Sequence, residues 1–511
     1  MTERPTSPGS GAAARPDAQP AEPVRAAAAP RPAPAGSADR PTADAWAALG
    51  GAADLLERVS FHGPDDLLPS GLPVRRLARA TVAACSLAAA ELAAHRSGGP
   101  VPAVRVDEGA VATAFVSERH LTVDGRTPVS FAPHSGFWRT TDGWVRTHAN
   151  YPHHRARLLA ALDLPADAGP EQLAAVLGGL PAERIQERAY AAGALAVAVA
   201  PVRDAELPLV EHRVVGSAPP RPLGGADVSR PAAGIRVLDL TRVIAGPVAT
   251  RTLALLGADV LRVDPPGIPE ADDAHADTGF GKRSTRLDLA DRADRAVFDG
   301  LLADADVLVT AYRPGALDAH GLAAEAVAQR HPGLVLAQLC AWGWTGPWSG
   351  RRGFDSLVQA GVGIAAHEAG PGGHPGVLPA QALDHGTGYL IAAGVLRALT
   401  DQRTGRPGGR HLRYSLAGTA SWLLHGIAPG ADAAAAGPVA GAAVGPAVGP
   451  AVGTAAGSSA APPYDPARWL AETDSAYGRL RHALPPVAYE GAPTDWARPP
   501  GRWGTDEPVW L

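Results

Sequence analysis

Short apolar segments alternate with helix-like segments over residues 234–340, and this order limits the fold more than any other feature of the chain. Strands that alternate with helices form a parallel sheet covered by helices on both faces. The sequence therefore predicts an α/β fold built on a doubly wound parallel sheet. The expected strands are 235–240, 259–263, 306–310 and 334–339, and the expected helices are 246–256, 291–302 and 323–329.

The turn after the first strand argues against a dinucleotide site. Residues 241–247 read TRVIAGP and contain one glycine, where the dinucleotide fingerprint needs three. The later segment 279–284, GFGKRS, lacks the spacing of a phosphate loop. Lys282 and Arg283 within it are candidates for contact with a phosphorylated ligand, and the alternative is a solvated pair of charges.

Charge and cysteine content exclude several classes of protein. The net charge is -5, so no basic surface for nucleic acid or for an acidic membrane is expected. Cys85 and Cys340 are too few for a disulfide framework or a metal cluster, and no metal site is predicted. The N-terminus has no basic stretch followed by an apolar one, so we expect no signal peptide and a cytoplasmic protein.

Asp384 is the strongest candidate for a catalytic residue. It stands in the segment 378–389, LPAQALDHGTGY, before a helix of small residues expected at 388–399. Two interpretations remain open from the residues alone. Asp384 can cap the helix, because free N–H groups and the helix dipole favour a carboxylate there, or it can be a nucleophile that forms a covalent acyl intermediate. His385 is expected at the surface or at the first position of that helix.

Several segments, in a fixed order between residues 237 and 424, resemble one known family. They are VLDLTRVIAGPVATRTLALLGADVLRVDPPG, GKRSTRLDL, ADVLVTAYRPGALDAHGL, WGWTGPWSGRRGFDSLVQAGVG and DHGTG with the helix that follows. Together they resemble the family III CoA-transferases (CaiB/BaiF), the group of formyl-CoA and carnitine CoA-transferases. The resemblance implies a Rossmann-like large domain with a smaller α+β domain.

The same resemblance implies roles for particular residues. Asp384 matches the family's nucleophile. The positions that match the CoA nucleotide site are Ile244, Ala245, Asp264, Ala311 and Tyr312, with Lys282 and Arg283 as further candidates. Family members often have basic residues after the second strand, where this chain has Pro265 and Pro266. The resemblance also implies that a CoA thioester is a substrate and that the protein has no tightly bound cofactor.

The order of the parts is unusual for the family. Residues 74–96 resemble the helix after Asp384, and this first copy has Leu77 in place of the nucleophile. The segment FWRTTDGWVRTHANYPHHRARLLAALDLP resembles the family's small domain, which ordinarily follows the large one, and YGRLRHALPPVAYEGAPTDWARPPGRWG resembles its C-terminal stretch.

The sequence thus predicts a rearranged fusion. Its parts are a disordered tail 1–43, a degenerate partial large domain 44–124, a small domain 125–231, a large domain 232–427, a flexible linker 428–463 and a C-terminal tail 464–511. We expect helix 74–96 to lie beside helix 388–403 and the tail to pack near the small domain. Both a homodimer and a monomer that completes its own site are compatible with this order.

The predicted function is that of an acyl-CoA:carboxylate CoA-transferase that acts through an aspartyl covalent intermediate, with acyl-CoA and carboxylic acids as its partners. Two alternatives remain open: a non-catalytic CoA-binding or scaffold protein, and an α-methylacyl-CoA racemase. The related racemases have a histidine as second base 30 residues before the aspartate, where this chain has Phe354. The sequence does not identify the acyl donor or acceptor.

Overall fold

The computed structural model describes residues 39–129, 131–204, 206–429 and 464–511. The expected tail 1–43 and linker 428–463 therefore lie largely outside the described residues. Residues 40–43 depart from the expected disorder because helix α1 (Arg40–Ala48) begins there. Its N-cap is Asp39, whose carboxylate accepts a hydrogen bond from the N–H of Thr42 at 2.9 Å.

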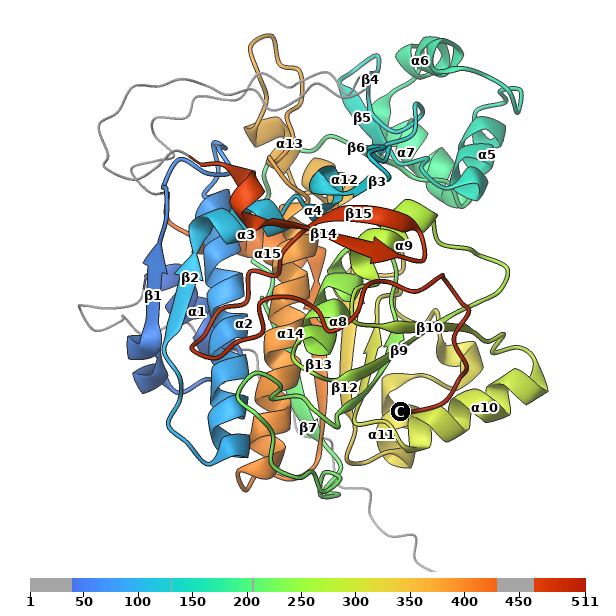
Figure 1. The fold of residues 1–511 in the computed structure, drawn as a ribbon. Helices are drawn as coiled ribbons and strands as arrows, with labels where there is room; N and C mark the ends of the chain where they lie inside the picture. The colour runs from blue at the N-terminus through green and yellow to red at the C-terminus, as the bar shows by residue number, and fades with distance from the viewer. Residues whose placement is uncertain (1–38, 130, 205, 430–463) are drawn as a thin grey trace, which may run out of the picture.

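A seven-stranded sheet occupies the middle of the molecule (Figure 1). Its strands, in spatial order, are β10 (Arg283–Arg286), β9 (Asp259–Asp264), β8 (Arg236–Leu240), β11 (Val307–Thr310), β12 (Val335–Cys340), β13 (Gly409–Ser415) and β7 (Glu211–Val215). All neighbours are parallel except β13 and β7. The predicted doubly wound parallel sheet is confirmed, with an antiparallel edge strand added. The strand order reverses between β8 and β11, which is where sheets of this kind bind their ligands.

Helices cover both faces of this sheet. Every second residue of β8, β9, β11 and β12 points to a face packed by α8 (Ala245–Leu255) and α14 (Ala382–Arg403). The alternate residues point to α10 (Arg292–Ala303) and α11 (Ala324–Arg330). The smaller helices of the large domain are α9 (Asp272–Thr278), α12 (Asp355–Gly361), α13 (Ile364–His367), α15 (Leu416–Ser421) and the short turns η2 (Asp318–His320) and η3 (Trp422–Gly426).

Helix α14 is buried on nearly all sides because helix α2 (Val74–Ser97) covers the face that the sheet does not (Figure 1). A Cβ placed on Gly386 would lie 2.8 Å from Leu77 of α2, and Arg397 forms an ion pair with Glu91 further along both helices. The predicted pairing of helix 74–96 with the helix after Asp384 is therefore confirmed. Helix α2 is long and apolar enough to cross a membrane, but 89% of its most apolar window is buried inside the protein.

A small α+β unit, whose elements span residues 137–198, lies against one end of the large domain (Figure 1). The range predicted for it, 125–231, is too long, because residues 211–215 form strand β7 of the large sheet. Its antiparallel sheet has the order β4 (Phe137–Arg139), β5 (Trp144–Thr147) and β6 (Ala196–Ala198), and its helices are α5 (Pro152–Ala161), α6 (Pro170–Gly178) and α7 (Ala182–Ala191). Leu158, Leu173 and Ile185 fill its own core. Beyond β6 the chain meets α12, where the N–H of Ala200 donates to the carbonyl of Ala360 at 3.0 Å.

The remaining elements come from the two ends of the chain. The N-terminal part adds η1 (Ala53–Arg58), β1 (Val59–His62), β2 (Val104–Asp107), α3 (Glu108–Ala114), α4 (Ser117–His120) and β3 (Thr122–Val123). The C-terminal part adds η4 (Pro466–Trp469), β14 (Leu470–Ser475) and β15 (Gly478–Ala483). Strands β1 and β2 pair in parallel, and β14, β15 and β3 form a second small antiparallel sheet.

The C-terminal tail contacts both borders of the predicted small domain: β15 pairs with β3 just before it, and Tyr489 donates to the carbonyl of Val228 near its end at 2.8 Å. The tail then runs along the outer strand of the large sheet. Trp503 donates to Asp264 at 3.0 Å, and Arg283 of β10 donates to the carbonyl of Val509 at 2.6 Å. An exposed strand edge is prone to pair with other chains, so the tail protects β10 in this fold.

Candidate active site

Asp384 lies in the first turn of α14, which begins at Ala382 with Gln381 as its N-cap. The helix starts earlier than predicted, and the capping interpretation of Asp384 is wrong. The side chain is 6% exposed. Within the part of the chain that the structure describes, no hydrogen bond or ion pair reaches its carboxylate. A buried carboxylate without such partners is held in place by the backbone alone and keeps its oxygens free for a substrate.

Asp355, the first residue of α12, makes the interactions that a capping residue would make for α14. Its Oδ2 accepts hydrogen bonds from the N–H groups of Leu383 and Asp384 at 2.9 and 3.0 Å, and its Oδ1 accepts one from Gln359 at 2.5 Å. Asp355 is 1% exposed. Asp355 was not predicted from the sequence, although it stands in the segment GFDSLVQ that carries part of the family resemblance.

The surroundings of Asp384 favour its protonated form. Burial raises the pKa of its carboxyl well above the ordinary range, and the nearby carboxylates of Asp355 and Glu118 raise it further. Burial also raises the pKa of Asp355, but the three hydrogen bonds that Asp355 accepts favour its charged form and oppose this effect. As the pH rises, Asp355 therefore loses its proton first, and Asp384 keeps its proton until a higher pH.

His385 contradicts its expected place at the surface. It is 0% exposed, its ring stacks on Phe115 at 5.4 Å between centroids, and its Nε2 lies 3.3 Å from the carboxylate of Glu118. Glu118 belongs to α4, so the N-terminal part of the chain forms one wall of the site. This neighbour is 267 residues away in sequence and could not be inferred from local pattern.

The structure brings the start of α8 close to Asp384. A Cβ on Gly388, one turn after Asp384, would lie 2.6 Å from the carbonyl oxygen of Ala245. Ile244 is the N-cap of α8, and Val243 before it has φ 73°, a left-handed conformation that costs a β-branched residue energy. Such strained turns cluster at functional sites, and this one lies at the reversal point of the strand order.

Not all of the other residues predicted to contact the CoA nucleotide are free to do so at the reversal point of the strand order. Ala311 and Tyr312 follow β11 directly, next to the turn after β8. Asp264 ends β9, but its carboxylate is buried in an ion pair with Arg262 at 2.6 Å and accepts from Trp503. The structure thus gathers Asp384, Ile244 and Ala245 in one place, with Ala311 and Tyr312 at the adjacent strand end.

Lys282 and Arg283 are not a solvated pair, and Lys282 reaches the first turn of α8 from inside the protein, where its Nζ donates to the carbonyl of Pro247 at 3.4 Å. Lys282 is buried and pairs with Asp239 at 3.1 Å, and burial lowers its pKa to about 8. Arg283 pairs with Asp259 at 2.9 Å beneath the C-terminal tail. Both charges are compensated inside the protein, and their contact with a phosphate stays a prediction that this geometry does not favour.

A different group of cations lies between the small unit and the large domain. A pocket of about 150 Å³ there is lined by Tyr190, Gly193, Ala194, Leu195, Arg313, Gly350, Arg351 and Arg352. Burial lowers the pKa of Arg352, and the nearby charges of Arg313 and Arg157 lower it further. Arg351 pairs with Glu187, whereas no acidic partner for these other three arginines is present among the described residues. Uncompensated cations in a pocket suit an anionic ligand.

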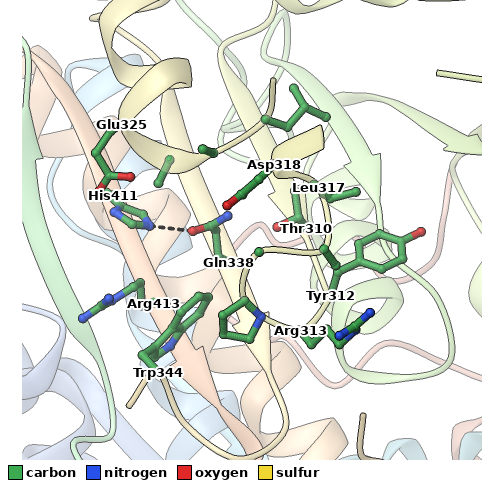
Figure 2. A pocket seen from close by; sticks show the side chains of 16 residues that line it. Thr310, Tyr312, Arg313, Leu317, Asp318, Glu325, Gln338, Trp344, His411 and Arg413 are labelled. Atoms are coloured by element: carbon green, nitrogen blue, oxygen red, sulfur yellow. Dashed lines mark hydrogen bonds between the residues drawn. The ribbon is translucent and has the colours of Figure 1, made fainter. Parts of the chain in front are cut away.

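A second pocket of about 170 Å³ opens near the ends of β11, β12 and β13 (Figure 2). Tyr312 and Arg313 contribute to it, so the segment after β11 borders this pocket while Arg313 also borders the arginine pocket. Inside it, His411 and Gln338 lie 2.8 Å apart and Arg413 stacks over Trp344, as Figure 2 shows. Tyr312 was predicted from the sequence, but Arg313 and Arg352 were not. The local signal for Arg352 is the pair of consecutive arginines, Arg351 and Arg352, shortly before Phe354.

In comparison with known proteins, residues 232–453 match the sequence model of CoA-transferase family III. An acetyl-coenzyme A transferase of Hypoxylon pulicicidum is 35% identical over 41% of this chain and 36% of its own length. Acetyl-CoA:oxalate CoA-transferase of Acetobacter aceti is 34% identical over 41% of this chain and 55% of its own length. Succinyl-CoA:glutarate CoA-transferase of Mus musculus is 34% identical over 36% of this chain and 46% of its own length.

The crystal structure of a CaiB/BaiF family protein from Brucella suis is 28% identical, with a TM-score of 0.35 over 39% of this chain and 59% of that one. The chain spans about half or less of the length of the curated relatives it matches.

Proposed function

We propose that this chain, whose residues 232–453 match the sequence model of CoA-transferase family III, is an acyl-CoA:carboxylate CoA-transferase with Asp384 as its nucleophile. The observation that carries the proposal is the buried carboxylate of Asp384, which accepts no hydrogen bond from any residue that the structure describes, while Asp355 binds the N–H groups beside it. The relatives' names support the class of reaction, since they describe transfer of CoA between acyl groups and acids.

The proposed reaction exchanges groups of similar energy and needs neither metal nor ATP. Asp384 first loses its proton to solvent. An oxygen of the resulting carboxylate attacks the thioester carbonyl, and the C–S bond breaks to give an acyl–aspartyl anhydride and CoA thiolate. The thiolate then attacks the aspartyl carbonyl and releases the acid. The acceptor acid attacks the aspartyl–CoA thioester, and CoA thiolate returns to the new acyl group, which regenerates the Asp384 carboxylate.

The protein's part is to bind CoA and to keep the reacting carboxylate dry. Arg157, Arg313 and Arg352 offer uncompensated positive charge to the phosphates of CoA, and Arg352 precedes Asp355 by three residues. The turn before α8 and the end of β11 lie at the reversal point of the strand order, and we propose that CoA approaches Asp384 there. A buried carboxylate that must lose its proton is poorly solvated, and poor solvation favours attack once the charge has formed.

The direct test is to incubate the protein with acetyl-CoA and then measure its intact mass. Transfer through Asp384 predicts a covalent CoA adduct that disappears when an acceptor acid is added and a new acyl-CoA forms. A scaffold or CoA-binding protein would bind acetyl-CoA without an adduct. The racemase alternative predicts deuterium uptake at the α-carbon of a 2-methylacyl-CoA in heavy water. We expect none, because Phe354 stands at the position of the second base.

Replacement of Arg352 by Gln should weaken binding of the CoA donor. We expect KM for acetyl-CoA to rise about 10- to 100-fold, because a charged hydrogen bond to a phosphate is worth about 1.5–3 kcal/mol, and kcat to change much less. The rise should shrink at high salt. Arg351→Gln is the matched control: Arg351 lines the same pocket, but Glu187 already compensates its charge at 2.7 Å. Equal effects of the two substitutions would contradict a phosphate role for Arg352.

A further inference from the structure

The turn between β8 and α8, residues 241–247, has a strained conformation. Val243 within it has φ 73°, which costs a β-branched residue energy, and the N-cap of α8, Ile244, has an apolar side chain that cannot cap the helix. The turn is also tightly closed, because a Cβ on Gly246 would lie 2.3 Å from the Cβ of Thr241. A turn of this kind keeps one shape only where the surrounding structure fixes both of its ends.

Asp239, near the end of β8, binds the end of the turn that leaves the strand. Its Oδ1 accepts hydrogen bonds from the N–H of Thr241 at 2.9 Å and from the hydroxyl of Thr241 at 2.5 Å. Its Oδ2 accepts a hydrogen bond from the hydroxyl of Thr250 in α8 at 2.6 Å. Asp239 is 0% exposed. This one buried carboxylate therefore joins the strand both to the turn and to the helix that follows it.

Lys282 binds the other end of the turn and neutralises Asp239. It stands just before β10, two strands away from β8, and its side chain is 1% exposed. Its Nζ donates to Asp239 at 3.1 Å, to the hydroxyl of Thr250 at 2.9 Å and to the carbonyl of Pro247 at 3.4 Å. An ammonium group has three N–H bonds, and these three contacts use all of them. Lys282 therefore has no donor left for a phosphate group.

From these contacts we infer that Lys282 is a positioning residue, which together with Asp239 and Thr250 fixes the turn 241–247 in the shape that receives CoA. The inference rests on the transferase function proposed above, in which CoA approaches Asp384 at this turn. Lys282 then acts on CoA affinity through the turn, in place of the direct phosphate contact expected from the sequence. Without Lys282 the turn would occupy several shapes, and CoA would bind only the fraction of molecules that has the right one.

The experiment measures binding of desulfo-CoA, which lacks the sulfur of CoA and therefore binds without reacting, by calorimetric titration. Lys282→Met removes the charge and the donors and keeps an unbranched side chain. We expect its Kd for desulfo-CoA to rise about 5- to 100-fold, which corresponds to the energy of one strained residue. KM for acetyl-CoA should rise by a similar factor and kcat should change much less, because the three hydrogen bonds of Lys282 go to β8 and α8.

A second variant separates positioning from stability. Lys282→Met alone leaves the buried Asp239 without its cation, so the urea midpoint of unfolding should fall. Lys282→Met combined with Asp239→Asn removes both charges at once, and its urea midpoint should return toward that of the unmodified protein. Its Kd for desulfo-CoA should stay about fivefold or more above the unmodified value, because the hydrogen bond to the carbonyl of Pro247 is still absent.

Arg397→Met is the matched control. Arg397 also pairs inside the protein, with Glu91, so its loss should lower the urea midpoint as well. It lies further along α14 than Gly388, where the turn meets that helix, so Kd for desulfo-CoA should stay within about twofold. A Kd within about twofold of the unmodified value in both Lys282 variants would overturn the inference, and so would a rise of equal size in Arg397→Met.

The binding measurement distinguishes failure of this inference from failure of the transferase function. If no covalent CoA adduct ever forms, but desulfo-CoA binds the unmodified protein and binds the double variant more weakly, Lys282 positions the turn in a protein that binds CoA without transferring it. If transfer is active and the unmodified protein and the double variant bind desulfo-CoA equally, the inference is wrong and the transferase function stands. If the unmodified protein does not bind desulfo-CoA, both are wrong.

Discussion

Asp384→Asn is expected to lower CoA transfer by on the order of 10⁴-fold or more, because an amide oxygen cannot form the anhydride on which each later step depends. The fold should be retained, since the N–H groups at the start of α14 are bound by Asp355 and not by Asp384. The measurement is the rate of glutaryl-CoA or another acyl-CoA formation, together with the intact mass after incubation with acetyl-CoA. Asp304→Asn, which alters an exposed carboxylate at the end of α10, is the control.

The same substitution should change the dependence of stability on pH. The folded-state pKa of Asp384 is raised above its unfolded value, so the protonated group contributes stability that is fully present below the ordinary carboxyl pKa of about 3.9. That contribution is lost as the pH rises through the folded-state pKa. The unfolding free energy of the unmodified protein should therefore fall, relative to that of Asp384→Asn, as the pH rises from 4 to 8.

Urea unfolding of both proteins at several pH values measures this difference. Transfer by the unmodified protein should depend on pH in the opposite sense, with activity lost on the acid side at a higher pH than an ordinary carboxyl group would give. Parallel stability curves for the two proteins would show that Asp384 is not the group with the raised pKa. Retention of near-normal transfer by Asp384→Asn would remove it as the nucleophile.

Leu77→Asp should destabilise the fold by roughly 4 kcal/mol or more and create no second active site. Leu77 is 0% exposed and packs against Gly386, between α2 and α14. An aspartate there removes a buried leucine and places an unpaired carboxylate on the helix next to that of Asp384. The expected loss is a large part of the 5–15 kcal/mol that stabilises a typical domain.

The position makes this test informative, because Leu77 is the residue that the internal repeat aligns with Asp384. Unfolding in urea measures the stability, and titration of covalent CoA adduct per chain measures the number of sites. Leu77→Met, which conserves volume, should cost less than about 1.5 kcal/mol and is the matched control. An adduct count that doubles in Leu77→Asp would show that the first copy retains a working site.

The central strands were predicted to within about one residue at their ends. Runs of consecutive apolar residues indicate these strands. Gly234 borders the first run, and Gly257 ends the helix before the second. The importance of Asp384 also came from a local motif. The start of its helix did not: it was expected at Gly388 and lies at Ala382, because Asp355 binds the first N–H groups of the helix from 29 residues earlier in the chain.

The sequence by itself therefore determined the parallel α/β architecture, the family resemblance and the candidate nucleophile, since each depends on residues close together in the chain. Tertiary structure alone decided which charges are compensated. Lys282 and Arg283 proved to be paired inside the protein, whereas Arg352 proved to have no acidic partner among the described residues. It also placed Glu118 beside His385 and the tail along β10. The physical reason is that the energy of a charge depends on its burial and its neighbours, and both are set by segments that meet only when the chain has folded.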